Sequence, residues 1–210
     1  MRKNGFGKAL MAGSLLAAAT GAAEATWSII IIDTRTGEIG VASATCLTGF
    51  DLRANTPVLI PGVGAATAQS AVDSTGQNRV KIRDLLVQGM DPNAIVGALA
   101  GFDSAHQSRQ YGIADTLGRT ATFTGLGAGA WAGGQVGQIG DLVYAVQGNV
   151  LTGEPVVAAA VQAIIDTPGD IAEKMMASME AARSMGGDGR CSCSGGNPTG
   201  CGAPPPTFTK

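Results

Sequence analysis

The start of this chain constrains its fold most, because a strand-like apolar run follows a leader-like segment with no linker between them. Residues 1–25 have a basic start, an apolar run and a small-x-small motif, which together predict a signal peptide cleaved after Ala25. The apolar run is shorter than the ~20 residues that cross a bilayer. Cleavage would leave Thr26 as the N-terminus, at the first position of a predicted strand over residues 26–33.

A threonine at a free N-terminus has a nucleophile and a base in one residue. Its α-amine, with an ordinary pKa of ~7.7–8.0, can take the hydroxyl proton directly or through one water. We therefore expect Thr26 to be catalytic, both as nucleophile and as α-amine base. Two alternatives stay open. A hydroxyl residue follows a cleavage site by chance often enough, and residues 21–23 offer a second cleavage site that would leave Thr26 blocked.

Charge and hydropathy argue against two classes of partner. The formal net charge is −2 and no basic patch with interleaved aromatic residues is present, so we expect no nucleic-acid partner. No later segment matches the apolar run of the leader, so we expect no membrane association after signal removal. The mature chain, long enough for one domain with a core, is predicted to be periplasmic or extracellular.

The four cysteines favour disulfides, because an exported chain meets an oxidising environment. Cys191, Cys193 and Cys201 lie near the C-terminus and Cys46 lies far upstream. Three pairings are open, but if all four thiols pair, one bridge must tie Cys46 to the tail. A metal site is the weaker interpretation, since no histidine is near and the spacing fits no common zinc pattern. We expect neither a metal nor a cofactor.

The order of predicted elements indicates an α+β domain. Helices at apolar 3.6-residue spacing include residues 82–89, 157–164 and 171–182, and another opens at Asp91-Pro92. The predicted strands cover residues 26–33, 38–44, 57–60, 63–69, 110–115, 119–124 and 142–147, the last followed by Gly148-Asn149. The glycine-rich residues 125–140 are interpreted as turns around a pocket mouth, and the chain from Gly186 onward as an irregular tail. Segregated helices and strands suit helical layers covering antiparallel sheet.

Polar residues at two strand ends are candidate site residues. Asn149 could donate to a developing oxyanion, with Gln147 nearby as a substrate contact. Gln69, at the end of another strand, is a second candidate for substrate binding. The alternative for all three is ordinary strand-end turn chemistry.

Arg109 and His106 are the remaining polar candidates. Arg109 could orient an anionic group of a substrate, or it could form a structural ion pair with Asp103 or Asp115. His106 has polar neighbours and is expected to be a solvated surface residue. Because it is the single histidine and no Gly-x-Ser-x-Gly motif accompanies it, a Ser-His-Asp triad is unsupported.

Several segments together resemble domain-of-unknown-function family 1028. They follow the family's order and comprise Thr26-Trp27-Ser28-Ile29, Gly37-Glu38-Ile39-Gly40-Val41-Ala42-Ser43, Gly62-Val63-Gly64-Ala65, Arg109-Gln110-Tyr111-Gly112-Ile113, Thr124-Gly125, Trp131-Ala132-Gly133, Tyr144-Ala145-Val146-Gln147-Gly148-Asn149 and Gly186-Gly187-Asp188. The resemblance implies the fold of the N-terminal-nucleophile (Ntn) hydrolases, a four-layer αββα sandwich of two antiparallel sheets. It also implies Thr26 as the nucleophile and Asn149 as the oxyanion donor.

The chain departs from the family pattern near its C-terminus. Family members have a Gly-Gly-Asp-x-Arg-Gly stretch before a final apolar strand, whereas residues 186–190 here run into a tail rich in Cys, Gly and Pro. Either the strand is absent or the sequence is truncated before it. We expect a signal peptide over 1–25, an Ntn-hydrolase-like domain over 26–190 and a tail over 191–210.

These observations predict an exported hydrolase that cleaves an amide C–N bond, in a peptide or a smaller amide, through an acyl-enzyme on Thr26. One alternative is a secreted binding or scaffold module that keeps the fold without turnover. Another is a structural cell-envelope protein, favoured only if the cysteine tail bridges to another chain. The oligomeric state, including a homo-oligomer, is left open.

Overall fold

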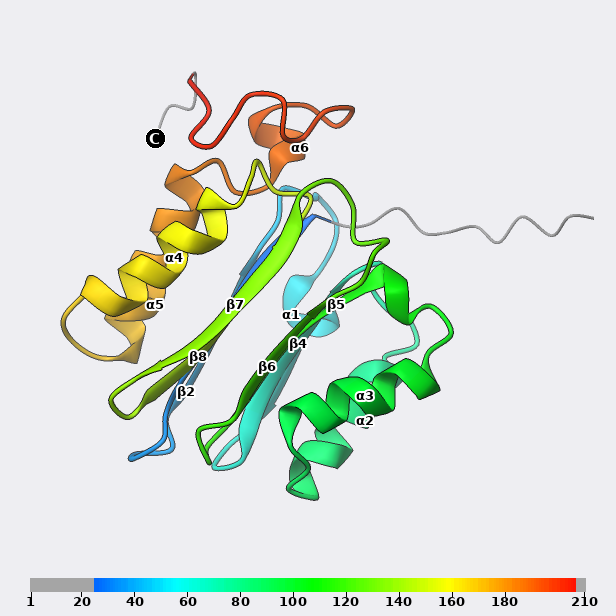
Figure 1. Ribbon diagram of the computed structural model, residues 1–210, viewed down its shortest axis with the longest axis vertical. Helices are drawn as coiled ribbons and strands as arrows, with labels where there is room; N and C mark the ends of the chain where they lie inside the picture. The colour runs from blue at the N-terminus through cyan, green and yellow to red at the C-terminus, as the bar shows by residue number, and fades with distance from the viewer. Residues whose placement is uncertain (1–24, 207–210) are drawn as a thin grey trace, which may run out of the picture.

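Two four-stranded antiparallel sheets lie face to face between two pairs of helices in the computed structural model, which describes residues 25–206 (Figure 1). The first sheet has the order β2-β1-β8-β7, formed by Ile39–Ala44, Thr26–Asp33, Leu142–Asn149 and Ala132–Ile139. The second has the order β3-β4-β5-β6, formed by Pro57–Ile60, Gly64–Ser70, Arg109–Asp115 and Thr120–Thr124. All the predicted strands are present.

A pair of helices covers the outer face of each sheet. Helices α4 (Pro155–Asp166) and α5 (Ile171–Ser184) pack on the first sheet, and α2 (Gln77–Val87) and α3 (Pro92–Phe102) pack on the second. The shorter elements are α1 (Leu52–Asn55), the 3-10 turn η1 (His106–Ser108) and α6 (Gly189–Ser192). The predicted α+β architecture, with helical layers over antiparallel sheet, is confirmed. None of the described helices is long and apolar enough to cross a membrane.

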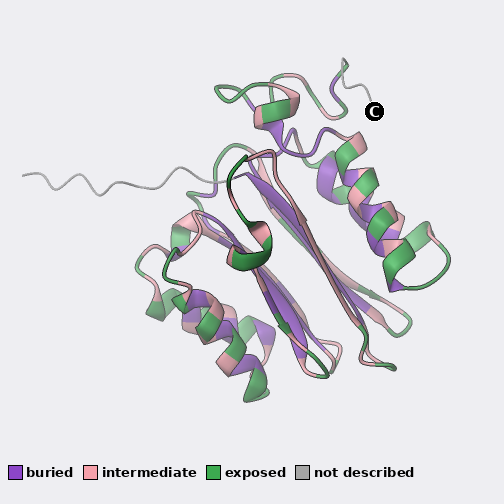
Figure 2. Ribbon diagram, turned by 180° about the vertical axis from the view of Figure 1, so that it is seen from behind, coloured by how far each residue is buried: buried purple, intermediate pink, exposed green. Residues whose placement is uncertain are grey.

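Strand β1 is buried on both faces, and apolar on both from Ile29 to Ile32, because it lies at the centre of the sandwich. Trp27, Ile29 and Ile31 pack against α4 and α5, while Ile30 and Ile32 face the second sheet. All five are buried, and Figure 2 shows the central strands of the two sheets mostly buried, with the edge strands more exposed. Successive residues of a strand point to opposite faces, so the unbroken apolar run follows from burial on both sides.

The interpretation of residues 125–140 as turns was wrong, because half of them form edge strand β7. Two of its glycines, Gly134 and Gly137, make room for side chains from other strands. A Cβ on Gly137 would lie 2.2 Å from the Tyr144 hydroxyl oxygen, and one on Gly134 would lie 2.5 Å from Thr122 Oγ1. Glycine is therefore needed here for close approach between strands rather than for a reversal of the chain.

The cysteine tail folds over the end of the sandwich where β1 begins (Figure 1). Disulfides join Cys46 to Cys191 and Cys193 to Cys201, which confirms the expected tie between the early strands and the tail. The tail is irregular except for α6, which Asp188 caps by accepting from the Arg190 N–H. Within residues 150–206 the sheet-like pairing is limited to one isolated bridge between Leu151 and Asp188.

Candidate active site

The space between the two sheets is polar at one end and apolar at the other. The apolar half contains Ile30, Ile32, Ala65, Ala114, Val143 and Ala145. The other half, termed here the polar layer, consists of Thr26, Ser28, Thr67, Gln69, Gln110, Gln147 and Asn149, each at most 2% exposed. Buried polar groups require hydrogen-bond partners, and most of those in the polar layer come from the protein itself.

Thr26 lies at one end of this polar layer, at the first position of β1. In the strand register it stands opposite Asn149, the last residue of β8. By strand alternation its side chain shares the inter-sheet face with Ser28 and Ile30. The Thr26 carbonyl accepts a 2.9 Å hydrogen bond from Gln69 Nε2, which comes from the opposite sheet. Pairing on one side and a cross-sheet hydrogen bond on the other therefore fix the Thr26 backbone.

Gln69 and Gln110 fasten the two sheets together behind Thr26. Gln69 Nε2 also donates to Gln110 Oε1 (2.8 Å), while Gln69 Oε1 accepts from the Ser28 hydroxyl (2.5 Å). Gln110 Nε2 in turn donates to the Gly148 carbonyl (2.8 Å). Both ends of the Gln69 carboxamide are thus engaged with protein, and its predicted contact with substrate remains a prediction.

Asn149 and Gln147 occupy different depths of the polar layer. Asn149 adjoins Thr26, and its Nδ2 donates to the Ala128 carbonyl at 3.3 Å. Gln147 lies deeper, donates to the Thr67 hydroxyl of the opposite sheet and packs on Gly112, where a Cβ would come within 2.1 Å of Gln147 Oε1. The structure therefore brings Asn149 next to Thr26 and puts Gln147 in a bridging position between the sheets.

Arg109 forms an ion pair, which was one of the alternatives left open by the sequence. Its Nε lies 2.8 Å from Asp103 Oδ2, and both side chains are less than 15% exposed. Burial alone would raise the pKa of Asp103, but hydrogen bonds from Arg109, Asn78 and the Ala105 N–H lower it overall. Asp115, the other candidate partner, pairs with Arg119 instead. Substrate binding by Arg109 remains a prediction.

His106 was expected at the surface, and this was wrong. Its side chain is buried, and its ring stacks on Phe123 with centroids 4.0 Å apart. Burial lowers the pKa of His106, and the nearby Asp103 carboxylate opposes this shift. Its polar neighbours in sequence belong to the turn η1 and do not determine where the imidazole points. Phe123 and Tyr111, which come from the adjacent hairpin, cover it.

The carbonyl that precedes Thr26 is bound by residues that the sequence did not indicate. Thr45 Oγ1 donates to the Ala25 carbonyl oxygen at 2.5 Å, and Arg190 Nη2 donates to it at 3.2 Å. The Asp188 carboxylate, 3% exposed, holds Arg190 through an ion pair of 2.9 Å. We refer to Thr45, Asp188 and Arg190 as the carbonyl-binding cluster. Asp188 and Arg190 stood in a segment noted only for its family resemblance.

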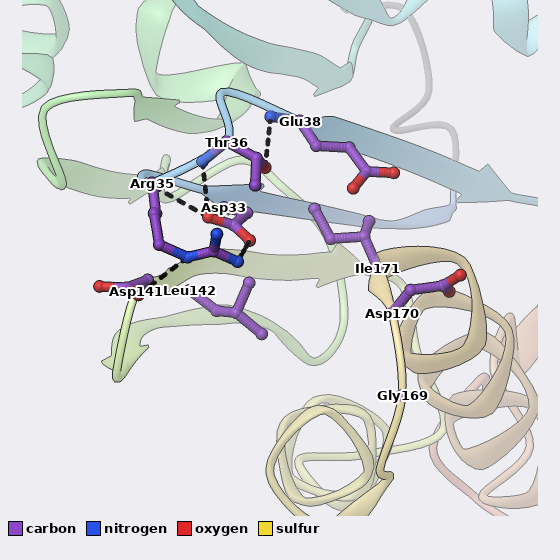
Figure 3. A pocket seen from close by; sticks show the side chains of 9 residues that line it. All are labelled: Asp33, Arg35, Thr36, Glu38, Asp141, Leu142, Gly169, Asp170 and Ile171. Carbon is purple, nitrogen blue, oxygen red and sulfur yellow. Dashed lines mark hydrogen bonds and ion pairs between the residues drawn. The ribbon is translucent and has the colours of Figure 1, made fainter.

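A separate open pocket of about 500 Å³ lies at the other end of β1 (Figure 3). Its lining residues are Asp33, Arg35, Thr36, Glu38, Asp141, Leu142, Gly169, Asp170 and Ile171. Arg35 lies 3.5 Å from carboxylates of both Asp33 and Asp141, and the turn N–H groups of Arg35 and Thr36 donate to Asp33. These contacts place Asp33, Arg35 and Asp141 in a structural role at the hairpin turn, and Asp170 is the N-cap of α5. Within the described residues, no group of three or more His, Cys, Asp or Glu side chains is placed to hold a metal ion.

The fold and this site define a class: an α+β sandwich of two antiparallel sheets with a threonine at the start of a central strand and a buried polar layer behind it. The model of the family of unknown function DUF1028 matches residues 26–196, and the chain belongs to that family. Its structure is similar to the crystal structure of protein SPO2555 from Silicibacter pomeroyi, also assigned to DUF1028. The two are 26% identical with a TM-score of 0.68, over 77% of this chain and 71% of that one. No curated protein matches the sequence.

Proposed function

We propose that this protein is an exported Ntn hydrolase that cleaves an amide bond through an acyl-enzyme on Thr26. The observation that carries the proposal is the position of Thr26 at the first residue of a central strand. There it adjoins Asn149, and Gln69 binds its carbonyl. A strand that begins at the nucleophile would hold the new N-terminus rigidly. The sandwich of two antiparallel sheets between helical layers is the architecture that the family resemblance implies.

The proposed reaction needs only the two functional groups of Thr26 and one water. The Thr26 hydroxyl oxygen bonds to the acyl carbon, its proton passes to the α-amine, and the carbonyl electron pair moves to oxygen. Collapse of this intermediate breaks the C–N bond, and the leaving amine takes the proton from the α-ammonium. Water then hydrolyses the Thr26 ester by the same proton relay. Asn149 is the proposed donor to the oxyanion.

Export is part of the proposal and is supported by the disulfides. Two disulfides within one domain are typical of proteins that mature in an oxidising compartment. Of the predicted signal peptide, residues 1–24 lie outside the described residues, so the cleavage after Ala25 remains a prediction. A periplasmic or extracellular location follows if that bond is cut.

Mass spectrometry of the exported protein tests the proposal directly. We expect a mature chain that begins at Thr26 and gains an acetyl group on treatment with p-nitrophenyl acetate, mapped to the Thr26 hydroxyl. Thr26→Ala should lose hydroxyl acylation, Thr26→Ser should retain part of it, and Thr36→Ala, an exposed threonine at the far end of the hairpin, should match the parent. A mature end upstream of Thr26, or equal labelling of Thr26→Ala, would refute the proposal.

The non-catalytic binding or scaffold module remains the second candidate, since Gln69 and Gln110 of the polar layer are already bonded to protein groups, which suits a structural role. It predicts an N-terminus at Thr26 without an acyl adduct. The third candidate, a structural protein cross-linked through its tail, loses its supporting observation. All four cysteines pair within the chain and no free cysteine is left to bridge to another one.

A further inference from the structure

We infer that Thr45 and Arg190 bind the acyl oxygen of the substrate, with Asp188 holding Arg190 in position. This inference rests on the proposed function, because it assigns residues to the same reaction. Thr45 and Arg190 would donate to the oxyanion together with Asn149, and both come from segments remote from β8. In the uncut chain these residues bind the Ala25 carbonyl.

The Ala25 carbonyl oxygen is held by a hydroxyl and a guanidinium. Thr45 Oγ1 lies 2.5 Å from it and Arg190 Nη2 lies 3.2 Å from it. Backbone carbonyls near a strand end usually accept hydrogen bonds from backbone N–H groups or water. It is therefore unusual that a guanidinium and a hydroxyl both donate to this one carbonyl. If the bond between Ala25 and Thr26 is cut, Ala25 leaves and both donors face the new N-terminus.

A substrate acyl group on Thr26 would occupy nearly the same place as the Ala25 acyl group. The nitrogen and the hydroxyl oxygen of a threonine are separated by two carbons, so both can bond to one carbon within a five-membered ring. An acyl carbon within reach of the Thr26 hydroxyl therefore lies close to the Ala25 carbonyl carbon, and its oxygen lies close to the same two donors. In the tetrahedral intermediate that oxygen is negative, and a cationic donor stabilises it more than it stabilises a neutral carbonyl.

Asp188 and a disulfide fix the two donors before any substrate arrives. Asp188 accepts from Arg190 Nε (3.2 Å) and Nη2 (2.9 Å), and also from the Cys46 N–H (3.0 Å). The disulfide between Cys46 and Cys191 covalently joins the residues that directly follow Thr45 and Arg190. Oxyanion donors act through preorganisation, and a carboxylate clamp next to a covalent bridge provides it. Asp188 is accordingly a positioning residue.

The test measures acetylation of the mature protein by p-nitrophenyl acetate as a function of probe concentration. Thr45→Val removes one donor at nearly constant shape, and we expect the maximal acetylation rate to fall roughly 10²-fold or more with an unchanged half-saturating concentration. Thr45→Ser should recover most of the rate. Arg190→Lys and Asp188→Asn should also lower the maximal rate, because each breaks the fork that aims the guanidinium.

Arg119→Lys provides the matched control. Arg119 forms a similar fork with Asp115, but in the hairpin between β5 and β6, at the far end of the sandwich. We expect its rate to match the parent, and urea unfolding should show that Thr45→Val is folded. If the parent is acetylated on Thr26 and Thr45→Val reacts at the same rate, the inference is wrong and the proposed function stands. If the parent itself is not acetylated, the proposed function fails and the inference fails with it.

Discussion

Replacing Gln69 with leucine should destabilise this protein by several kcal/mol, because the Gln69 carboxamide connects three elements of the polar layer. Leucine has a similar volume, so the substitution leaves no large cavity and mainly removes hydrogen bonds. The side chain is 1% exposed, which prevents water from replacing the lost partner. The effect therefore depends on which buried groups lose a hydrogen bond.

Four groups are affected, of which Asn149 Oδ1 loses only a long contact of 3.5 Å. The Thr26 carbonyl and Gln110 Oε1 each lose a donor, at 2.9 and 2.8 Å, and the Ser28 hydroxyl loses an acceptor. Ser28 keeps its 2.7 Å contact with Ser43, so its loss is the smallest. A buried acceptor deprived of its donor costs about 1–3 kcal/mol, which gives about 2–6 kcal/mol for the two acceptors together.

Urea unfolding of the mature protein, with its disulfides intact, measures this difference. The matched control is Gln135→Leu, the same change at an exposed position of β7, which we expect to stay within about 0.5 kcal/mol of the parent. A Gln69→Leu protein as stable as that control would refute the reasoning. The carboxamide would then not be structural, and the prediction that Gln69 binds substrate would become the better account of it.

Two further predictions concern stability. In a chain-entropy treatment, the bridge spanning 145 residues should contribute about 5 kcal/mol and the one spanning 8 residues about 2.5 kcal/mol. The double variant Cys46→Ser/Cys191→Ser should therefore unfold at lower urea than Cys193→Ser/Cys201→Ser, and equal midpoints would contradict this. Burial lowers the pKa of His106 below its ordinary value of ~6.5, so the stability linked to its neutral form is present above that pH and lost as the pH falls further. His106→Gln should flatten the dependence of unfolding free energy on pH between about 7 and 5. An unchanged slope would mean that other groups cause the pH dependence.

The strands and helices could be predicted from the sequence wherever burial follows a local period. Residues 26–33 and 142–149 alternate between two buried faces, and Asp91-Pro92 marks the start of α3, where Asp91 accepts from the Asn93 N–H. The prediction failed where a distant residue decides the outcome. Gly134 and Gly137 of β7 are explained by side chains of β6 and β8, and His106 is buried by Phe123, which is 17 residues further along. Contacts of this kind cannot be inferred from a local sequence pattern.

The candidate site was partly predictable for the same reason. Gln69 and Asn149 could be found because a polar residue at the end of an apolar strand is visible locally. Gln110 could have been found as well, since it alternates with the buried Tyr111 and so had to face the other sheet. Thr45 and Arg190 could not, because they lie 145 residues apart and meet only where the tail folds back over the start of β1.

The polar layer also determines where the Thr26 side chain points. A slip of β1 by one residue against β8 would exchange its two faces, and Trp27 and Ile29 would then face the second sheet in place of Thr26 and Ser28. Such a slip would leave Gln69 without the Ser28 hydroxyl and would bury its carboxamide against apolar side chains. A polar network whose side chains bond to one another across the two sheets rejects this alternative more strongly than an apolar layer, which tolerates one apolar residue in place of another. The polar layer thus keeps the register in which Thr26 faces the space between the sheets, as a nucleophile at that position requires.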